Sequence, residues 1–369
     1  MTPAFSSSRQ AAAFALLLAG VLASPVLVAK TGWLNRRDVY PAIPVKYGPF
    51  AWIQQQIYAT TNDADIVFLG SSHIWYGVNT PHVQNKLSER LGREAQVFTM
   101  AWCWPGYDAA YVMARDLFQH RHVRMLVIDD EDNPAYEDAP HVQSWRWLRP
   151  GENSDALTGL PLPVKLSVYG GMVLGTPRNL LSLVRPNLLE DPAANHPDYW
   201  SKEFGAPNFA AQRGSLRVRL DFNSPRDFTP FAPPIAANPA DAAVYSPQTR
   251  DTFTFTGQPM RPYQLFFARK LARLCQECGT RLVVLHVPVL KEQAQATIPE
   301  RGPWSEILGA PVTVVGIPGG KIFGGIPAPD VPRFFYNDTH LNQNGQDRFT
   351  SLITPSLIGL YAAPNPAPL

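Results

Sequence analysis

Cysteine and blocks of like charge are scarce in this chain. Three cysteines among 369 residues do not make a disulfide framework. The 32 lysines and arginines nearly balance the 30 aspartates and glutamates, and they form no basic block that could follow a phosphate backbone. We therefore expect no nucleic-acid partner. Apolar residues (45%) and 37 prolines are abundant, which predicts a globular core joined by long ordered connections.

The cysteines that are present have structural explanations. Cys275 and Cys278 form a Cys-x-x-Cys motif, which can act as a redox pair. However, the motif ends an amphipathic pattern that begins at Tyr263 and stops at Gly279, and glycine is typical of helix C-termini. We therefore favour a packing role over a redox role, and we expect Cys103 to be packed as well.

A long uncharged segment stands near the N-terminus. Residues 11–29 are mainly Ala, Leu and Val, with Arg9 before them and Lys30 after them, which is typical of an export signal. The run is long enough to cross the roughly 30 Å hydrocarbon core of a bilayer as a helix. We therefore predict that residues 1–31 form an uncleaved membrane anchor. The rest of the chain would lie outside the cytoplasm, in the periplasm or at the cell surface.

This segment has two alternative explanations. Small residues at Ala23 and Ala29 suit a signal peptidase, and cleavage there would release the protein. Pro25 would also bend a spanning helix. A buried N-terminal helix of a cytosolic domain is disfavoured, because such a helix normally has a polar face and this segment has none.

The residues after the anchor follow an α/β pattern. Residues 32–64 are predicted to form a linker with a short lead-in helix, and residues 65–369 to form one domain. Predicted apolar strands lie at 66–69, 96–99, 124–128, 281–287 and 312–315, and predicted helices at 80–91, 107–119, 262–278 and 344–360. This alternation predicts a doubly wound, five-stranded parallel sheet with helices on both faces. The ligand crevice of such a sheet lies at the carboxyl ends of its strands.

An insertion at about 135–260 interrupts this domain. It contains Trp145, Trp147 and Trp200, many prolines, and a stretch at 160–184 that has helical pieces. It could act as a substrate lid or rest on the membrane. Equally, it could be a helical subdomain that only covers the edge of the sheet.

Two loops at the predicted carboxyl edge carry reactive side chains. Ser71 and Ser72 directly follow the first strand, while Asp338 and His340 precede the last helix. A serine is inert until an imidazole takes its proton, and the imidazole needs a partner that fixes its tautomer. We therefore predict Ser72 as nucleophile, His340 as base and Asp338 as the orienting carboxylate. Taken singly, the first loop could be only a helix N-cap and the second only a polar turn.

Four short segments resemble the sequence blocks of the SGNH (GDSL-like) hydrolases. They are residues 68–72, the loop 104–107, the strand end 132–134 and residues 338–342. The resemblance covers about 65–135 and 262–360, and it implies a flavodoxin-like three-layer sandwich. It also implies that Ser72 is the nucleophile. The oxyanion hole would consist of the backbone N–H groups of Ser72 and Gly106 and the side chain of Asn133.

The chain departs from the pattern of that family in two blocks. Many members have Gly-Asp-Ser in the first block, whereas this chain has Gly70-Ser71-Ser72, and aligning the glycines places Ser72 at the nucleophile. The last block is commonly Asp-x-x-His, but here Asp338 lies two residues before His340. This spacing is similar to that of the SGNH subunits that O-acetylate alginate, so we retain Asp338 as the orienting residue.

An acidic run at residues 129–132 directly precedes Asn133. Carboxylates beside a developing oxyanion would oppose catalysis unless they point away or pair with a basic group. The run also offers oxygen ligands for a divalent cation. Because consecutive side chains on an extended segment alternate in direction, at most alternate members converge. We therefore predict no metal site and no cofactor.

Together these features predict serine-dependent acyl-ester chemistry outside the cytoplasm. The anchor and the tryptophan-rich insertion favour O-acyl transfer, such as acetyl transfer, from an acyl-ester donor through Ser72 to a cell-surface polysaccharide. The similar anchored SGNH proteins imply a multi-pass membrane acyltransferase as a candidate partner. One alternative is an esterase that passes the acyl group to water. Another is a non-catalytic polysaccharide-binding or assembly protein on an SGNH-like scaffold.

Overall fold

The computed structural model describes most of the predicted domain and little of the predicted insertion. The described residues are 5–31, 35–43, 48–102, 106–130, 141, 147–148, 158–184, 260–298, 304–335 and 338–364. Asn133 and Cys103 lie outside them, as does most of the insertion at about 135–260. Within the insertion, the described part that forms a long element is the helix α8 (Leu162–Val184).

A five-stranded parallel sheet forms the centre of the domain, which confirms the predicted α/β class. Its strands are β1 (Ala64–Ser71), β2 (Val97–Trp102), β3 (Val123–Asp129), β4 (Arg281–Leu285) and β5 (Thr313–Val315). They are ordered β2-β1-β3-β4-β5, and every neighbouring pair is parallel. The chain order reverses beside β1, so the crevice at this switch point lies next to the end of β1.

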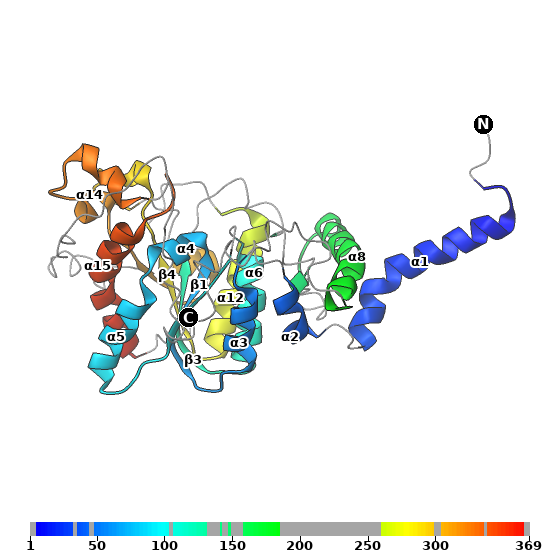
Figure 1. Cartoon of the computed structure of the whole chain (residues 1–369), viewed down its shortest axis with the longest axis horizontal. Coiled ribbons are helices and arrows are strands. Elements are labelled where there is room, and N and C mark those ends of the chain that lie inside the picture. Colours follow the sequence, from blue (N-terminus) through cyan, green and yellow to red (C-terminus); the bar gives the residue numbers. More distant parts are fainter. Residues whose placement is uncertain are drawn as a thin grey trace.

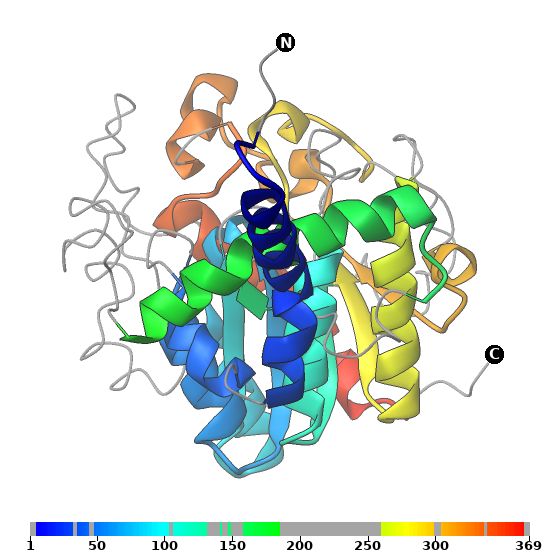
Figure 2. The same cartoon turned by 90° about the vertical axis from the view of Figure 1, so that its right-hand side faces the viewer.

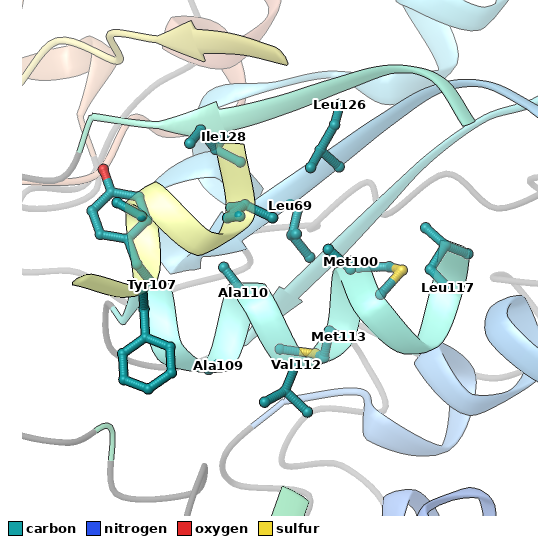
Figure 3. Close-up of a cluster of buried hydrophobic side chains, with 14 of the residues drawn as sticks. Leu69, Met100, Tyr107, Ala109, Ala110, Val112, Met113, Leu117, Leu126 and Ile128 are labelled. Atoms are coloured by element: carbon teal, nitrogen blue, oxygen red, sulfur yellow. The ribbon is translucent and has the colours of Figure 1, made fainter. Parts of the chain in front are cut away.

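Helices cover both faces of the sheet (Figure 1). One face carries α3 (Phe50–Tyr58), α6 (Tyr107–Phe118) and α12 (Pro262–Glu277), and the other carries α4 (Ser72–Gly77), α5 (Thr80–Leu91) and α15 (Gln343–Ala362). Successive side chains of β1 enter opposite cores: Val67 and Leu69 join the first, Ile66 and Phe68 the second. Figure 3 shows the first core, in which α6 packs beneath Leu69 and Leu126.

Local sequence determines where several of these helices begin and end. The Asn79 side chain accepts a hydrogen bond from the backbone N–H of His82 and so caps α5, which ends before Gly92 in the left-handed conformation. Gly279 likewise has a positive φ of 66° after α12, as the sequence predicts. Cys275 and Cys278 are free thiols, and burial raises the pKa of Cys275, which fits a packing role.

Short helices connect the later strands to α15. They are η7 (Leu290–Glu292), α13 (Trp304–Leu308), α14 (Gly319–Ile322) and η8 (Ala328–Phe334). An isolated antiparallel bridge joins Phe335 to Leu341 just before α15 begins. This bridge closes the loop that carries Asp338 and His340, and it fixes the start of that loop next to its end.

The predicted N-terminal segment forms the helix α1 (Ser8–Thr31). Its residues Ser8–Val28 have a mean hydropathy of 2.4, so the helix is long and apolar enough to cross a membrane or to serve as a signal sequence. Most of its side chains are exposed, which argues against the alternative of a helix buried in the domain. Figure 1 shows α1 extending away from the sheet, with α8 beside it.

The segment after α1 is attached firmly to the domain. It forms α2 (Arg36–Val39) and η1 (Tyr40–Ala42), and two of its side chains reach the same acidic residue of α6. Arg36 Nη2 lies 2.5 Å from Asp116 Oδ1, and the Tyr40 hydroxyl donates to Asp116 Oδ2 over 3.0 Å. Asp116 and Tyr40 are both buried. Breaking such a buried pair on one side typically costs about 3–5 kcal/mol.

Candidate active site

The two serines at the end of β1 have different surroundings. The Ser71 hydroxyl accepts a hydrogen bond from the backbone N–H of His73 over 3.1 Å, and it donates to Asp129 Oδ2 over 3.3 Å. Ser71 is thus the buried N-cap of α4, which is the structural role considered for either serine. Ser72 is the first residue of α4 and is partly exposed. Of the two serines, Ser72 is therefore the one placed to meet a substrate.

The structure brings Ser72 and His340 together across 268 residues of sequence. Ser72 Oγ lies 2.9 Å from His340 Nε2, which is within hydrogen-bonding distance. His340 is held in the loop before α15, where the Asn342 side chain caps the helix by accepting from Gly345 N. The Tyr76 ring packs against the His340 ring, with the two centroids 4.8 Å apart. A serine and an imidazole in this geometry can transfer a proton directly.

The opposite nitrogen of His340 contacts a hydroxyl group. Nδ1 lies 2.9 Å from Thr339 Oγ1. When Nε2 accepts the Ser72 proton, Nδ1 carries the ring proton and donates to this oxygen. Asp338 is exposed, and its main-chain oxygen accepts a hydrogen bond from Leu290 N over 2.9 Å. The orienting role of Asp338 stays a prediction, while the contact with Thr339 was not foreseen from the sequence.

Burial keeps the His340 imidazole neutral. It lowers the pKa of His340 from about 6.5 to about 4. The ring is therefore unprotonated at neutral pH and can accept a proton from Ser72. The predicted nucleophile and the predicted base therefore already lie in contact in the protein without a substrate.

A second histidine, His73, lies behind His340. The two ring centroids are 6.3 Å apart, and the rings are nearly perpendicular. Burial, together with the neighbouring His340, lowers the pKa of His73 to about 3, while Asp130 and a hydrogen bond with the backbone of Thr339 oppose the shift. His73 is thus a neutral ring that contacts the loop carrying the base. The sequence places it beside Ser72, but does not show that it faces the distant loop.

A third histidine, His286, lies between two carboxylates at the same edge of the sheet. His286 directly follows β4, and its Nδ1 lies 2.8 Å from Asp130 Oδ2 while its Nε2 lies 3.1 Å from Glu292 Oε2. Burial lowers its pKa, but the two carboxylates outweigh this effect and raise it to about 10. His286 is therefore an imidazolium at neutral pH. Its position after a strand at the carboxyl edge is the signal that could have identified it in the sequence.

The first two members of the acidic run have separate partners. Asp129 accepts the hydrogen bond from Ser71, and Asp130 binds His286. They point in different directions, as expected for neighbours on an extended segment. Within the described residues, no three His, Cys, Asp or Glu side chains form a group that could hold a metal ion. Asp130 and Glu292 in particular lie on opposite nitrogens of the His286 ring rather than around a shared point.

Gly106 stands at the edge of the sheet that carries Ser72. It is the N-cap of α6, and it follows the loop after Trp102, whose partner across the sheet is Ser71. A Cβ at Gly106 would lie 2.7 Å from Asp108 Oδ1 and 2.8 Å from His141 Cβ, so the backbone approaches these groups more closely than other residues allow. Asn133 lies outside the described residues. The oxyanion hole of Ser72, Gly106 and Asn133 therefore stays a prediction.

Comparisons with known proteins add no assignment. No family model, curated protein or solved structure matches the chain. We therefore infer a function from the geometry of Ser72 and His340 and from the sequence blocks around them.

Proposed function

We propose that the protein catalyses acyl-ester chemistry through an acyl-Ser72 intermediate. The observation that supports this most directly is the 2.9 Å contact between Ser72 Oγ and His340 Nε2 at the carboxyl edge of a parallel sheet. The lowered pKa of His340 adds to it, because the imidazole is then in the form that accepts a proton. The resemblance to SGNH hydrolases agrees with this chemistry.

The reaction would proceed in two halves. In the first, Ser72 Oγ forms a bond to the ester carbonyl carbon as its proton moves to His340 Nε2. The carbon–oxygen bond to the leaving alcohol then breaks, and the imidazolium returns the proton to that alcohol. In the second half, an acceptor hydroxyl gives its proton to His340 Nε2 and forms a bond to the acyl carbon; the bond from that carbon to Ser72 Oγ then breaks, and the imidazolium returns its proton to Ser72 Oγ. Throughout, Thr339 Oγ1 accepts a hydrogen bond from the Nδ1–H of His340, and Asp338 is proposed to stabilise the imidazolium.

For the acceptor, we propose a hydroxyl group of a cell-surface polysaccharide. The exposed apolar helix α1 supports an exported, membrane-anchored protein, which would meet such polymers. The tryptophans of the insertion support a polysaccharide acceptor less than the sequence suggests. Trp147 is buried and offers no face to a sugar, while Trp145 and Trp200 lie outside the described residues. A multi-pass membrane acyltransferase remains the proposed source of acyl groups.

A fluorophosphonate probe tests the nucleophile directly. The full chain, purified in detergent, should be labelled covalently, and Ser72→Ala should abolish labelling. Ser71→Ala is the matched control, because it removes the neighbouring hydroxyl from the N-cap and leaves Ser72 in place. Labelling that persists in Ser72→Ala would remove this residue as nucleophile. A complete lack of labelling and of acetyl-ester turnover in the folded protein would favour a non-catalytic polysaccharide-binding protein.

A second assay separates transfer from hydrolysis. The protein is given an activated acetyl ester with and without an oligosaccharide acceptor, and both free acetate and acetylated sugar are measured. Transfer predicts that the acceptor lowers acetate release and gains acetyl groups in equal amount. If no acceptor diverts acetyl groups from water, the protein is an esterase. Adding membranes that contain a multi-pass acyltransferase tests whether that partner supplies the donor.

A further inference from the structure

The helix α8 has two faces of different character. On one face, Val168, Met172 and Thr176 recur once per turn and are buried against the domain. The other face carries five exposed aliphatic side chains: Leu162 (68%), Leu166 (63%), Leu174 (74%), Leu181 (36%) and Val184 (78%). At 3.6 residues per turn these five lie within roughly 120° of the helix circumference. These five residues form an apolar stripe, although Val173 within the same arc is buried, and exposed apolar side chains gathered in this way usually mark an interaction surface.

This stripe adjoins the exposed surface of α1. The Tyr169 hydroxyl of α8 donates to the main-chain oxygen of Leu22 in α1 over 2.6 Å. Figure 1 shows α8 between the sheet and α1, and Figure 2 shows α8 running across the direction of α1. The helix α8 contacts α1, α2 and η1, so its exposed leucines lie in the same region of the molecule as the exposed apolar side chains of α1, such as Leu17 at 67% exposure.

We propose that α8 lies in the interface of the bilayer that α1 spans, with its exposed leucines among the lipid acyl chains. This inference rests on the membrane anchor of the proposed function and is independent of the chemistry at Ser72. An amphipathic helix that lies along a membrane buries its apolar face about 5–10 Å below the headgroup boundary. Such a helix runs across a spanning helix, as α8 does in Figure 2.

The contact between the two helices agrees with this depth. Leu22 precedes Val28, the end of the apolar span, by six residues, which correspond to about 9 Å along a helix. Tyr169 contacts α1 at this level, and tyrosine is enriched at membrane interfaces because its ring is apolar and its hydroxyl polar.

The composition of the stripe favours lipid over a protein partner. Its large exposed side chains are all Leu or Val. Protein interfaces are instead enriched in aromatic residues, Met and Arg at their centres. A second copy of this chain is therefore the less suitable occupant, and it gives a different product in the experiment below.

Site-specific photo-crosslinking tests this placement. Benzoylphenylalanine replaces Leu166 in the full chain, which is reconstituted into phosphatidylethanolamine and phosphatidylglycerol vesicles and irradiated. Leu174 provides a second position in case the first variant does not fold. Asn85, an exposed residue of α5 far from α1, is the control without lipid, and Leu17 in α1 is the control for insertion. Products are identified by mass spectrometry.

We expect adducts with the mass of one phospholipid at Leu166, Leu174 and Leu17, and only background at Asn85. A crosslinked dimer from Leu166 or Leu174 would overturn the proposal in favour of a second copy. Lipid adducts at Leu17 without any at the two α8 positions would overturn it and leave the anchor intact. The absence of lipid adducts at Leu17 would overturn both the anchor and the placement of α8, without bearing on Ser72.

Discussion

Thr339 Oγ1 lies 2.9 Å from His340 Nδ1, on the ring edge opposite the nitrogen that meets Ser72. This hydroxyl can accept a hydrogen bond from the Nδ1–H, and the ring is then in the tautomer that leaves Nε2 able to accept a proton. It stabilises the imidazolium less than a carboxylate would, because it carries no charge. We propose that Thr339 and Asp338 share the roles that one aspartate performs in many serine enzymes.

Thr339→Val should lower kcat/KM for ester hydrolysis roughly 10- to 100-fold. The substitution keeps the shape of the side chain and removes a hydrogen bond to a group that becomes charged, worth about 1.5–3 kcal/mol. Thr339→Ser is the control and should retain most activity. Steady-state kinetics with an acetyl ester measure the effect.

Asp338→Asn decides the role of the predicted carboxylate. If the Asp338 charge stabilises the imidazolium during turnover, kcat should fall while the binding of the ester changes little. Full activity in Asp338→Asn together with a defect in Thr339→Val would remove Asp338 from the mechanism. The reverse pattern would mean that the loop rearranges to bring the carboxylate to Nδ1.

The activity should persist to unusually low pH. Burial holds the pKa of His340 at about 4, so the imidazole loses its function as a base only when the pH falls through this value. A profile of kcat/KM against pH should therefore show its acidic limb near pH 4 rather than near 6.5. Circular dichroism at each pH controls for unfolding. A limb at or above 6.5 would show that a carboxylate pairs with the ring in the free enzyme.

The stability of the domain should decrease in alkaline solution because of His286. Its pKa is about 10 in the folded protein and about 6.5 when unfolded, so its protonation stabilises the fold fully below pH 6.5. That contribution is lost as the pH rises from 6.5 to 10. Urea unfolding at the two pH values should show a larger decrease for the wild type than for His286→Gln. Equal decreases would contradict a charged His286.

Removing the Asp130 carboxylate, which pairs with His286, should lower the free energy of unfolding strongly at neutral pH. Asp130→Asn leaves the buried His286 imidazolium without one of its two carboxylates, and we expect a cost of about 3–5 kcal/mol. By contrast, Ser71→Ala removes one helix cap and should cost about 1 kcal/mol while Ser72 still reacts with the probe. Urea unfolding measures the stability of the two variants. A larger loss of stability in Ser71→Ala than in Asp130→Asn would contradict a charged pair between His286 and Asp130.

The sequence predicts the ends of a helix or strand well where neighbouring residues determine them. The helix α5 runs over Thr80–Leu91 as expected, because Asn79 caps its start and Gly92 its end. Strand β1 is longer than the predicted 66–69, since its outer residues gain hydrogen-bond partners only from the adjacent strands. The end of β1 at Ser71, paired with Trp102, is therefore a property of the assembled sheet.

The candidate site shows the same contrast between features that local sequence determines and features that depend on the assembled sheet. The proximity of Ser72 and His340 was predicted because both loops lie at the carboxyl edge of the sheet. The contact of His286 with Asp130 was not, since it depends on the register that places Asp129 opposite Leu285. The contact of Thr339 with His340 cannot be deduced from the spacing of residues, because it depends on the rotamer of the Thr339 side chain.

The binding of Arg36 and Tyr40 to Asp116, close to the end of α1, would limit which parts of a polymer can reach Ser72. Four residues, 32–35, separate α1 from α2, and such a connection spans at most about 18 Å. Beyond it, Arg36 and Tyr40 both bind Asp116, so the domain begins directly after this short connection. With α1 in a bilayer, Ser72 would stay within a limited height above the lipid. A long polysaccharide would then be acylated as each part passes that height during export, and not at sites far from the membrane.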